Sequence, residues 1–190
     1  MNPTSLETVV PEAPLERTDD GVVPAGEGWF VLNVHDAQWF DGGELGGLYT
    51  SFEGVDARFA ELGFGLGILR PGEANALYHG EDAEENFLVL AGECLLLIEE
   101  EERLLRAWDF VHCSPWAEHI FVGAGEGPCL VLAVGTRRKG RGLRFPVSEL
   151  ALKHGAGVKV ETSDSREAYA GFGEPRPRSC PAEFSELTRG

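Results

Sequence analysis

Two segments of the chain contain side chains of the types that bind metal ions. His79, Glu81 and Glu85 lie within LYHGEDAEENF, and His119 begins the later segment HIFVGA. Imidazole nitrogens combined with carboxylate oxygens are suitable ligands for Zn, Mn, Fe, Ni or Co. The sequence therefore predicts one divalent-metal site formed by His79, Glu81, Glu85 and His119, with the identity of the metal left open.

The spacing of these residues indicates whether their side chains can meet. His79 and Glu81 are two positions apart, so on a strand both side chains would leave the same face. Glu85 is the first residue of the next apolar run and lies at one of the alternate positions whose side chains point inward. His119 is the first residue of a later run. Structural roles without a metal remain alternatives for each of these residues. Glu81 is explained equally well as a surface carboxylate, Glu84 competes with Glu85, and the histidines could be a loop residue and a core residue.

The elements that would position these residues are short apolar runs separated by Gly, Pro, Asp and Glu. Runs of this kind are typical strands, and the turns between them are too short for crossover helices, which favours antiparallel pairing. The predicted strands are Trp29 to Val34, Gln38 to Phe40, Leu48 to Phe52, Phe64 to Arg70, Glu85 to Gly92, Glu93 to Glu100, Asp109 to Cys113, His119 to Ala124 and Cys129 to Thr136.

Several of these runs are apolar on both faces, such as FLVL and CLVLAV. A sheet with one face in water would alternate, so a second layer must cover the other face. Either two sheets pack together, or a closed barrel is covered outside by another subunit or by the tails of the chain. If another subunit covers the barrel, we expect that subunit to be a second copy of the chain, which would make the protein a homodimer.

The composition divides the chain into three parts. Residues 1–28 lack apolar periodicity and are predicted to be a flexible N-terminal arm, residues 29–145 contain the predicted strands, and residues 146–190 are predicted to form a helical extension with a Pro-rich tail. Within the extension, VSELALKH ends at Gly155 and SDSREAYA begins at Ser163, and each is predicted to form a short helix.

The charge of the chain excludes some classes of partner. With 16 basic and 32 acidic residues, the formal net charge is −16, which repels a phosphate backbone and an anionic membrane surface. No apolar run approaches the roughly 18 residues that a membrane span needs, and the first residues do not have the pattern of a secretory signal. We therefore expect a cytoplasmic protein whose partner is a small-molecule ligand or substrate, with no nucleic acid and no membrane.

The two metal-ligand segments resemble the two motifs of the cupin family, over about Phe64 to Gly135. The positions that match are Pro71, Gly72, His79, Glu85 and Gly92 in the first motif and Asp109, Pro115 and His119 in the second. Three positions depart from the family pattern. Glu81 stands where a second histidine is expected, Trp116 replaces a turn glycine, and Gly123 lies where an asparagine often does.

The resemblance implies an all-β fold, an antiparallel, jelly-roll-like cupin β-barrel, followed here by short C-terminal helices. It also implies a divalent metal in the barrel and a metalloenzyme that acts on a small polar molecule, with dioxygenase-like or isomerase-like chemistry. The main alternative is a non-catalytic cupin that binds or senses a small ligand. A purely structural cupin would leave the pairing of His79 with His119 unexplained.

Overall fold

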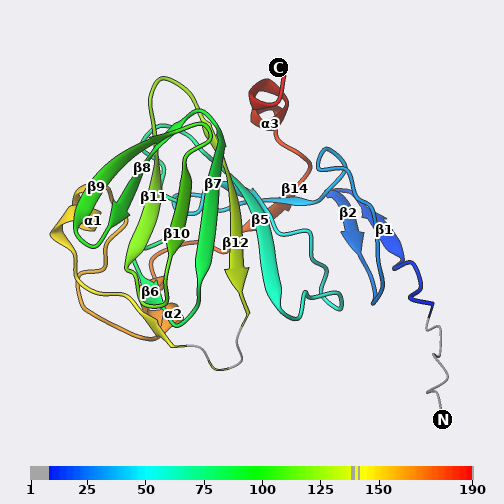
Figure 1. The fold of residues 1–190 in the computed structure, drawn as a ribbon, viewed down its shortest axis with the longest axis horizontal. Helices are drawn as coiled ribbons and strands as arrows, with labels where there is room; N and C mark the ends of the chain where they lie inside the picture. The colour runs from blue at the N-terminus through cyan, green and yellow to red at the C-terminus, as the bar shows by residue number, and fades with distance from the viewer. Residues whose placement is uncertain (1–8, 138–139, 141, 190) are drawn as a thin grey trace, which may run out of the picture.

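The computed structural model describes residues 9–137, 140 and 142–189, and most of these residues lie in or between β-strands (Figure 1). The elements in chain order are β1 (Leu15–Thr18), β2 (Gly21–Pro24), β3 (Trp39–Asp41), β4 (Leu48–Thr50), β5 (Leu62–Leu69), β6 (Gly80–Glu81), β7 (Glu85–Ala91), β8 (Glu93–Ile98), β9 (Glu101–Arg106), β10 (Phe110–Cys113), β11 (His119–Ala124), β12 (Cys129–Thr136), β13 (Leu143–Arg144), α1 (Glu149–Lys153), α2 (Ser165–Ala168), β14 (Arg176–Arg178) and α3 (Ala182–Leu187). The predicted β-rich chain with short C-terminal helices is confirmed. In the described part of the chain, no helix combines the length and apolar character needed to cross a bilayer.

Two sheets contain most of the strands. The larger sheet has seven strands in the order β10-β7-β12-β5-β4-β3-β14, and the smaller has three in the order β11-β8-β9. Neighbouring strands in both sheets pair antiparallel, as the short connections predict. Among the described residues, no ladder of hydrogen bonds joins the two sheets, so closure into a barrel stays a prediction.

The space between the two sheets holds one apolar cluster. Its buried side chains alternate along the strands, so that Phe87 and Val89 of β7 and Val131 of β12 lie in one cluster with Leu96 of β8 and Phe121 of β11. Burial of such side chains is the main driving force that holds two sheets together. The candidate metal ligands lie at one end of this cluster.

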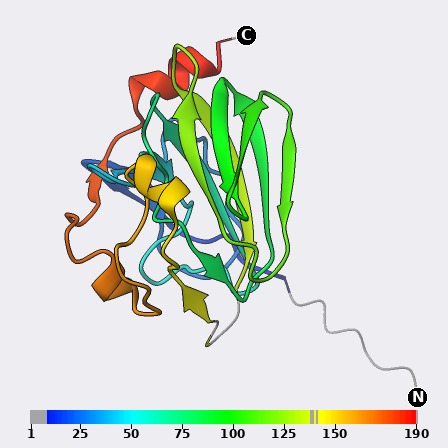
Figure 2. The same cartoon turned by 90° about the vertical axis from the view of Figure 1, so that its left-hand side faces the viewer.

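The outer face of the smaller sheet is covered by the chain itself. Leu97 and Ile120 point away from the first cluster and contact Phe145 and Ala151, which belong to the region after β12. Figure 2 shows this region, yellow through red, along one side of the green strands. The second layer that the doubly apolar strands require is therefore supplied in part by the C-terminal extension, and a homodimer stays a prediction.

The first helix of the extension begins and ends as its sequence predicts. The Ser148 side chain accepts a hydrogen bond from the backbone N–H of Ala151 at 3.0 Å, which satisfies one of the free donors of the first turn. Gly155 follows the helix with φ of +70°, a conformation that glycine adopts without strain.

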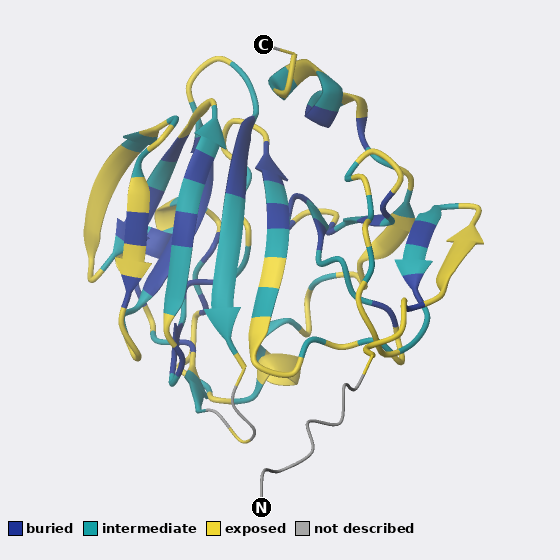
Figure 3. Cartoon of the chain, turned by 45° about the vertical axis from the view of Figure 1, so that its right-hand side comes forward, coloured by how far each residue is buried: buried dark blue, intermediate teal, exposed yellow. Residues whose placement is uncertain are grey.

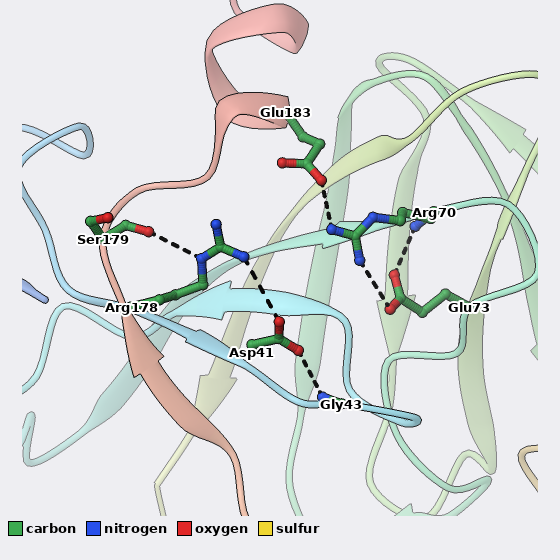
Figure 4. Close-up of polar contacts among 7 residues, drawn as sticks. All are labelled: Asp41, Gly43, Arg70, Glu73, Arg178, Ser179 and Glu183. Carbon is green, nitrogen blue, oxygen red and sulfur yellow. Dashed lines mark hydrogen bonds and ion pairs between the residues drawn. The ribbon is translucent and has the colours of Figure 1, made fainter.

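The end of the chain returns to the larger sheet. Strand β14 pairs with β3, and α3 places Phe184 against Trp39 with the ring centroids 5.5 Å apart. Ion pairs surround this contact: Arg70 binds Glu183 at 2.6 Å, and Arg178 lies 3.8 Å from Asp41 (Figure 4). The sequence did not predict β14 or α3 in this Pro-rich segment, because both are short and their apolar contacts come from distant strands.

The N-terminal region differs from the prediction in two ways. Strands β1 and β2 form a hairpin inside the predicted flexible arm, and Ala13 and Val22 are buried. Conversely, residues 29–34 form no strand, since Trp29 and Val31 are largely exposed and have no sheet to cover. Residues 1–8 of the arm lie outside the described residues, and the division at residues 28 and 145 stays a prediction.

Strand β9 was also missed. Its sequence, EERLLR, is mostly charged and exposed, as the yellow strand at the left edge of Figure 3 shows. It is an edge strand of the smaller sheet, and at such an edge charged residues limit unwanted pairing with other strands.

We predict that Phe184→Ala lowers the free energy of unfolding by about 3 kcal/mol, because it removes a buried ring from the contact between α3 and the larger sheet. Urea denaturation would measure this loss. Glu186→Ala on the exposed side of α3 is the control and should change stability by no more than about 0.5 kcal/mol. Equal stability of the two variants would contradict the docking of α3.

Candidate metal centre

The backbone brings His79 and His119 side by side. His79 directly precedes β6, and His119 is the first residue of β11. The two residues form an isolated antiparallel bridge, in which the His119 N–H donates to the His79 carbonyl at 2.9 Å and the His79 N–H to the His119 carbonyl at 3.4 Å. Their ring centroids lie 5.5 Å apart.

Hydrogen bonds to the backbone determine which nitrogen of each ring faces the site. His79 Nδ1 lies 2.7 Å from the Leu77 carbonyl oxygen, and His119 Nδ1 lies 2.9 Å from the Ala117 carbonyl oxygen. A carbonyl oxygen only accepts hydrogen bonds, so each Nδ1 carries the proton. Each neutral ring therefore keeps its Nε2 lone pair for another partner, as in metal-binding histidines whose second nitrogen donates to a carbonyl group.

Two carboxylates complete the cluster. One ligand atom each from His79, Glu81 and Glu85 lie within 4.8 Å of one another. Bonds of about 2.0–2.2 Å to a shared ion would place two ligands on opposite sides about 4.4 Å apart, so the observed spacing is close to that of a metal site. Glu81 is only 5% exposed, which disfavours the alternative that it is a surface carboxylate.

His119 joins the cluster through Glu85. His119 Nε2 lies 3.4 Å from Glu85 Oε2, although His119 is not one of the three residues whose ligand atoms are mutually close. With the proton on Nδ1, this contact brings a lone pair toward a carboxylate oxygen. Such an arrangement is unfavourable unless a proton or a metal cation lies between the two atoms.

The surroundings of the rings keep both histidines neutral. Burial is the largest cause that lowers the pKa of His79, followed by the neighbouring His119 ring. Burial likewise lowers the pKa of His119, while the Ala117 carbonyl and Glu81 act in the opposite direction. Phe145 packs against His79 and Phe87 against His119, with centroids 5.9 and 5.3 Å apart, so that water is excluded from these sides. Neutral imidazole is the form that binds a metal.

One side of the cluster faces a cavity. Glu85 lines an open cavity of about 370 Å³ together with Gly63, Gly65, Ala133 and Gly135. These four neighbours have little or no side chain, and Phe64, Thr136 and Arg137 complete the lining, so a small molecule could approach Glu85 from this direction. The donor set thus fits a divalent ion that would keep at least one side accessible to a ligand.

The four residues that the sequence predicts as ligands converge here, and their role in binding metal stays a prediction. Tyr78, which directly precedes His79, takes no part in this cluster. The Tyr78 ring is buried in the cluster on the other face of the smaller sheet, and its hydroxyl accepts a hydrogen bond from Glu100 N–H at 3.3 Å. Desolvation by this burial raises the pKa of Tyr78 to about 12.

Sequence reasoning missed the groups that support the ligands. The carbonyls of Leu77 and Ala117 orient the imidazoles, and each lies two residues before its histidine, a spacing that gives no signal in side-chain chemistry. Phe145 was also missed, because it reaches His79 from a distant segment. Cys113 pairs with Glu85 across β10 and β7, and burial raises the pKa of its thiol to about 12. This thiol is therefore protonated at neutral pH and a poor ligand.

Comparisons with known proteins agree with this fold. Residues 65–135 match a family model described as Cupin domain. No curated protein matches the chain.

Several solved structures share part of the fold. A sugar phosphate isomerase from a cupin superfamily of Silicibacter pomeroyi DSS-3 is 24% identical with a TM-score of 0.47, and the match covers 52% of this chain and 64% of that chain. An RmlC-like cupin from Shewanella frigidimarina NCIMB 400 is 17% identical with a TM-score of 0.44, over 54% and 85% of the two chains. A Cupin 2 conserved barrel domain protein from Salinispora arenicola CNS-205 is 20% identical with a TM-score of 0.41, over 46% and 72%.

The match spans less than two thirds of the Silicibacter protein, and all three TM-scores are below 0.5. The family match is more specific, since its range contains all four candidate ligands and the strands that hold Glu85 and His119. Residues 65–135 of this chain therefore match the Cupin domain family, in agreement with the resemblance that the two sequence motifs show.

Proposed function

We propose that the chain is a metal-dependent cupin enzyme that binds a divalent ion through His79, Glu81, Glu85 and His119. The observation that carries this proposal is the pair of neutral imidazoles whose Nε2 atoms are left for the site, next to two carboxylates from β6 and β7. A divalent ion bound there would polarise oxygen atoms of a substrate, which is the step that dioxygenase-like and isomerase-like reactions share.

The residues of the chain would each have a distinct part. Leu77 and Ala117 hold the imidazoles in the binding tautomer through their carbonyl oxygens. Phe87 and Phe145 exclude water beside the rings, which strengthens electrostatic interactions within the site. Glu85 lies where the ligand cluster meets the cavity, so a substrate would enter on its side.

The proposal includes the barrel that the family resemblance implies. The two sheets would act as its walls, with the apolar cluster around Phe87, Leu96 and Phe121 filling one part of the interior. The ligands lie at one end of that cluster, so the metal would be bound at the mouth and the cavity would be the remaining free interior. The partner of the protein is then a small molecule rather than a macromolecule.

We predict that His79→Ala and His119→Ala each lower metal affinity by more than about 100-fold, the upper end of the loss caused by removing a supporting partner of a ligand. The measurement is elemental analysis of protein purified without a metal-affinity tag, followed by calorimetric titration with Zn²⁺ and Mn²⁺. His112→Ala is the control, because His112 lies on the neighbouring strand β10 with an exposed side chain that contacts Asn86. Wild-type metal content in both site variants would refute the proposed ligands.

The role of Glu81 has its own test. We expect Glu81→Gln to weaken metal binding about as strongly as Glu85→Gln, because both carboxylates lie in the close group of ligand atoms and an amide is a poorer ligand. Calorimetric titration of the two variants under one condition compares them directly. A much smaller effect at Glu81 would remove it from the ligand set and leave one more position open to substrate.

Metal affinity should also depend on pH. Protonation of either imidazole competes with the metal, so affinity falls as the pH drops. Because burial lowers the pKa of His79 and His119, both rings stay neutral at the ordinary histidine value of about 6.5, and the loss of binding should occur below that pH. Titrations between neutral and acidic pH would measure it. A midpoint at or above pH 7 would contradict the neutral, buried state of the rings.

A further inference from the structure

The inner face of β5 is almost bare of side chains. Positions 63, 65, 67 and 69 point toward the smaller sheet, as does Ala133 on the paired strand β12, and only Leu69 of these four has a side chain. Gly67 shows the consequence most directly, because a Cβ atom added there would meet no heavy atom within 4 Å. The missing side chains leave open space on the inner face beside Glu85.

A second cavity occupies this space. It has a volume of about 480 Å³, within the range of roughly 300–1,000 Å³ that is usual for small-molecule sites. Its lining is mostly apolar, with Leu45, Tyr49, Tyr169 and Phe172 among the contributors, and Thr50, Asn75 and Glu174 add polar groups. A mostly apolar lining stabilises a hydrocarbon ring by burying its surface, and Tyr49, Tyr169 and Phe172 offer ring faces against which it can pack.

The cavity is closed on one side by the C-terminal extension. Tyr169 follows α2, and its hydroxyl accepts a hydrogen bond from Leu77 N–H at 3.1 Å. Phe172 packs against Tyr169 with the ring centroids 6.1 Å apart. Leu77 also supplies the carbonyl that orients His79. The aromatic wall formed by Tyr169 and Phe172 and the candidate ligand His79 are therefore both hydrogen-bonded through the backbone of Leu77.

The second cavity adjoins the one at the candidate metal centre. Gly65 and Ala133 line both, and Glu85 lines the end nearest the ligand cluster. A molecule of moderate size could therefore place a ring against Tyr49 and Tyr169 and extend a polar group toward Glu85. Near that end, Arg137 lies over Gly63 and pairs with Glu53.

We infer that the substrate or ligand of this protein is an aromatic or alicyclic small molecule with one oxygen-bearing end, and that its ring occupies the cavity beside Gly67. This inference rests on the proposed function for the direction of the polar end, whereas the ring site depends only on the cavity. It adds an apolar body to the small polar molecule that the sequence suggested.

The test uses substitutions of Gly67 that place a side chain in the cavity and leave the four candidate metal ligands unchanged. Gly67→Leu would project a side chain into the space, and Gly67→Ala would fill less of it. Gly127→Leu is the matched control, because Gly127 lies between β11 and β12, outside both cavities, and a Cβ there also meets nothing within 4 Å. Phenol and benzoate are the aromatic probes and glucose 6-phosphate is the polar comparison, each followed by saturation-transfer NMR with metal-free and zinc-loaded protein.

We expect phenol or benzoate to bind the wild type and the Gly127→Leu variant, with little or no binding of glucose 6-phosphate. Gly67→Leu should weaken binding of the aromatic probe by roughly 10-fold or more, as overfilling a packed space does, and Gly67→Ala should have an intermediate effect. Zinc affinity and the melting temperature of the Gly67 variants should stay near those of the wild type.

Three outcomes would overturn the inference: no binding of either aromatic probe, equal binding by the Gly67→Leu and wild-type proteins, or preferential binding of glucose 6-phosphate. Failure of the metal proposal is a separate result. In that case His119→Ala would keep its zinc affinity, while the response of the aromatic probe to Gly67→Leu would still support the ring site in the metal-free protein.

Discussion

The pair of backbone hydrogen bonds between His79 and His119 is the interaction on which the candidate site depends. It joins the segment before β6 to the first residue of β11, and it places two imidazoles 5.5 Å apart. Neither histidine could be positioned by its own strand alone, because β6 has only two residues and His119 lies at a strand end. The neighbouring carbonyls of Leu77 and Ala117 then fix the ring tautomers, so backbone geometry determines the chemistry of both side chains.

The C-terminal extension stabilises this arrangement from outside. It supplies Ala151 on the outer face of the smaller sheet and Tyr169, which contacts Leu77, and Phe145 directly before it lies beside His79. The same extension lines the apolar cavity through Tyr169 and Phe172. A segment outside the range of the family match therefore supports the ligands and shapes the space in which a substrate would bind, which is how one fold can serve different substrates.

The departures from the cupin motifs have physical reasons in the structure. At Gly123, a Cβ atom would lie 2.1 Å from the Arg70 carbonyl oxygen, so the asparagine often found there has no room. Trp116 occupies the left-handed region with φ of 72°, where glycine is usual. Its ring lies over Gly142, at which an added Cβ atom would lie only 2.5 Å from the ring.

Much of the strand pattern and the identity of the four candidate ligands were predictable from the sequence, because alternation of apolar residues and the spacing of His79, Glu81, Glu85 and His119 are local properties. Strands β11 and β12 begin and end where the apolar runs do. The pairing of β14 with β3, the hairpin of β1 and β2, and the aromatic wall from Tyr169 and Phe172 were decided only by the tertiary structure. Their partners are distant in the chain, and short or charged segments have too little periodicity to reveal such contacts. The glycines of β5 illustrate the same limit: the sequence shows that side chains are missing, but only the packing of the surrounding strands decides that the space they leave is a cavity beside Glu85.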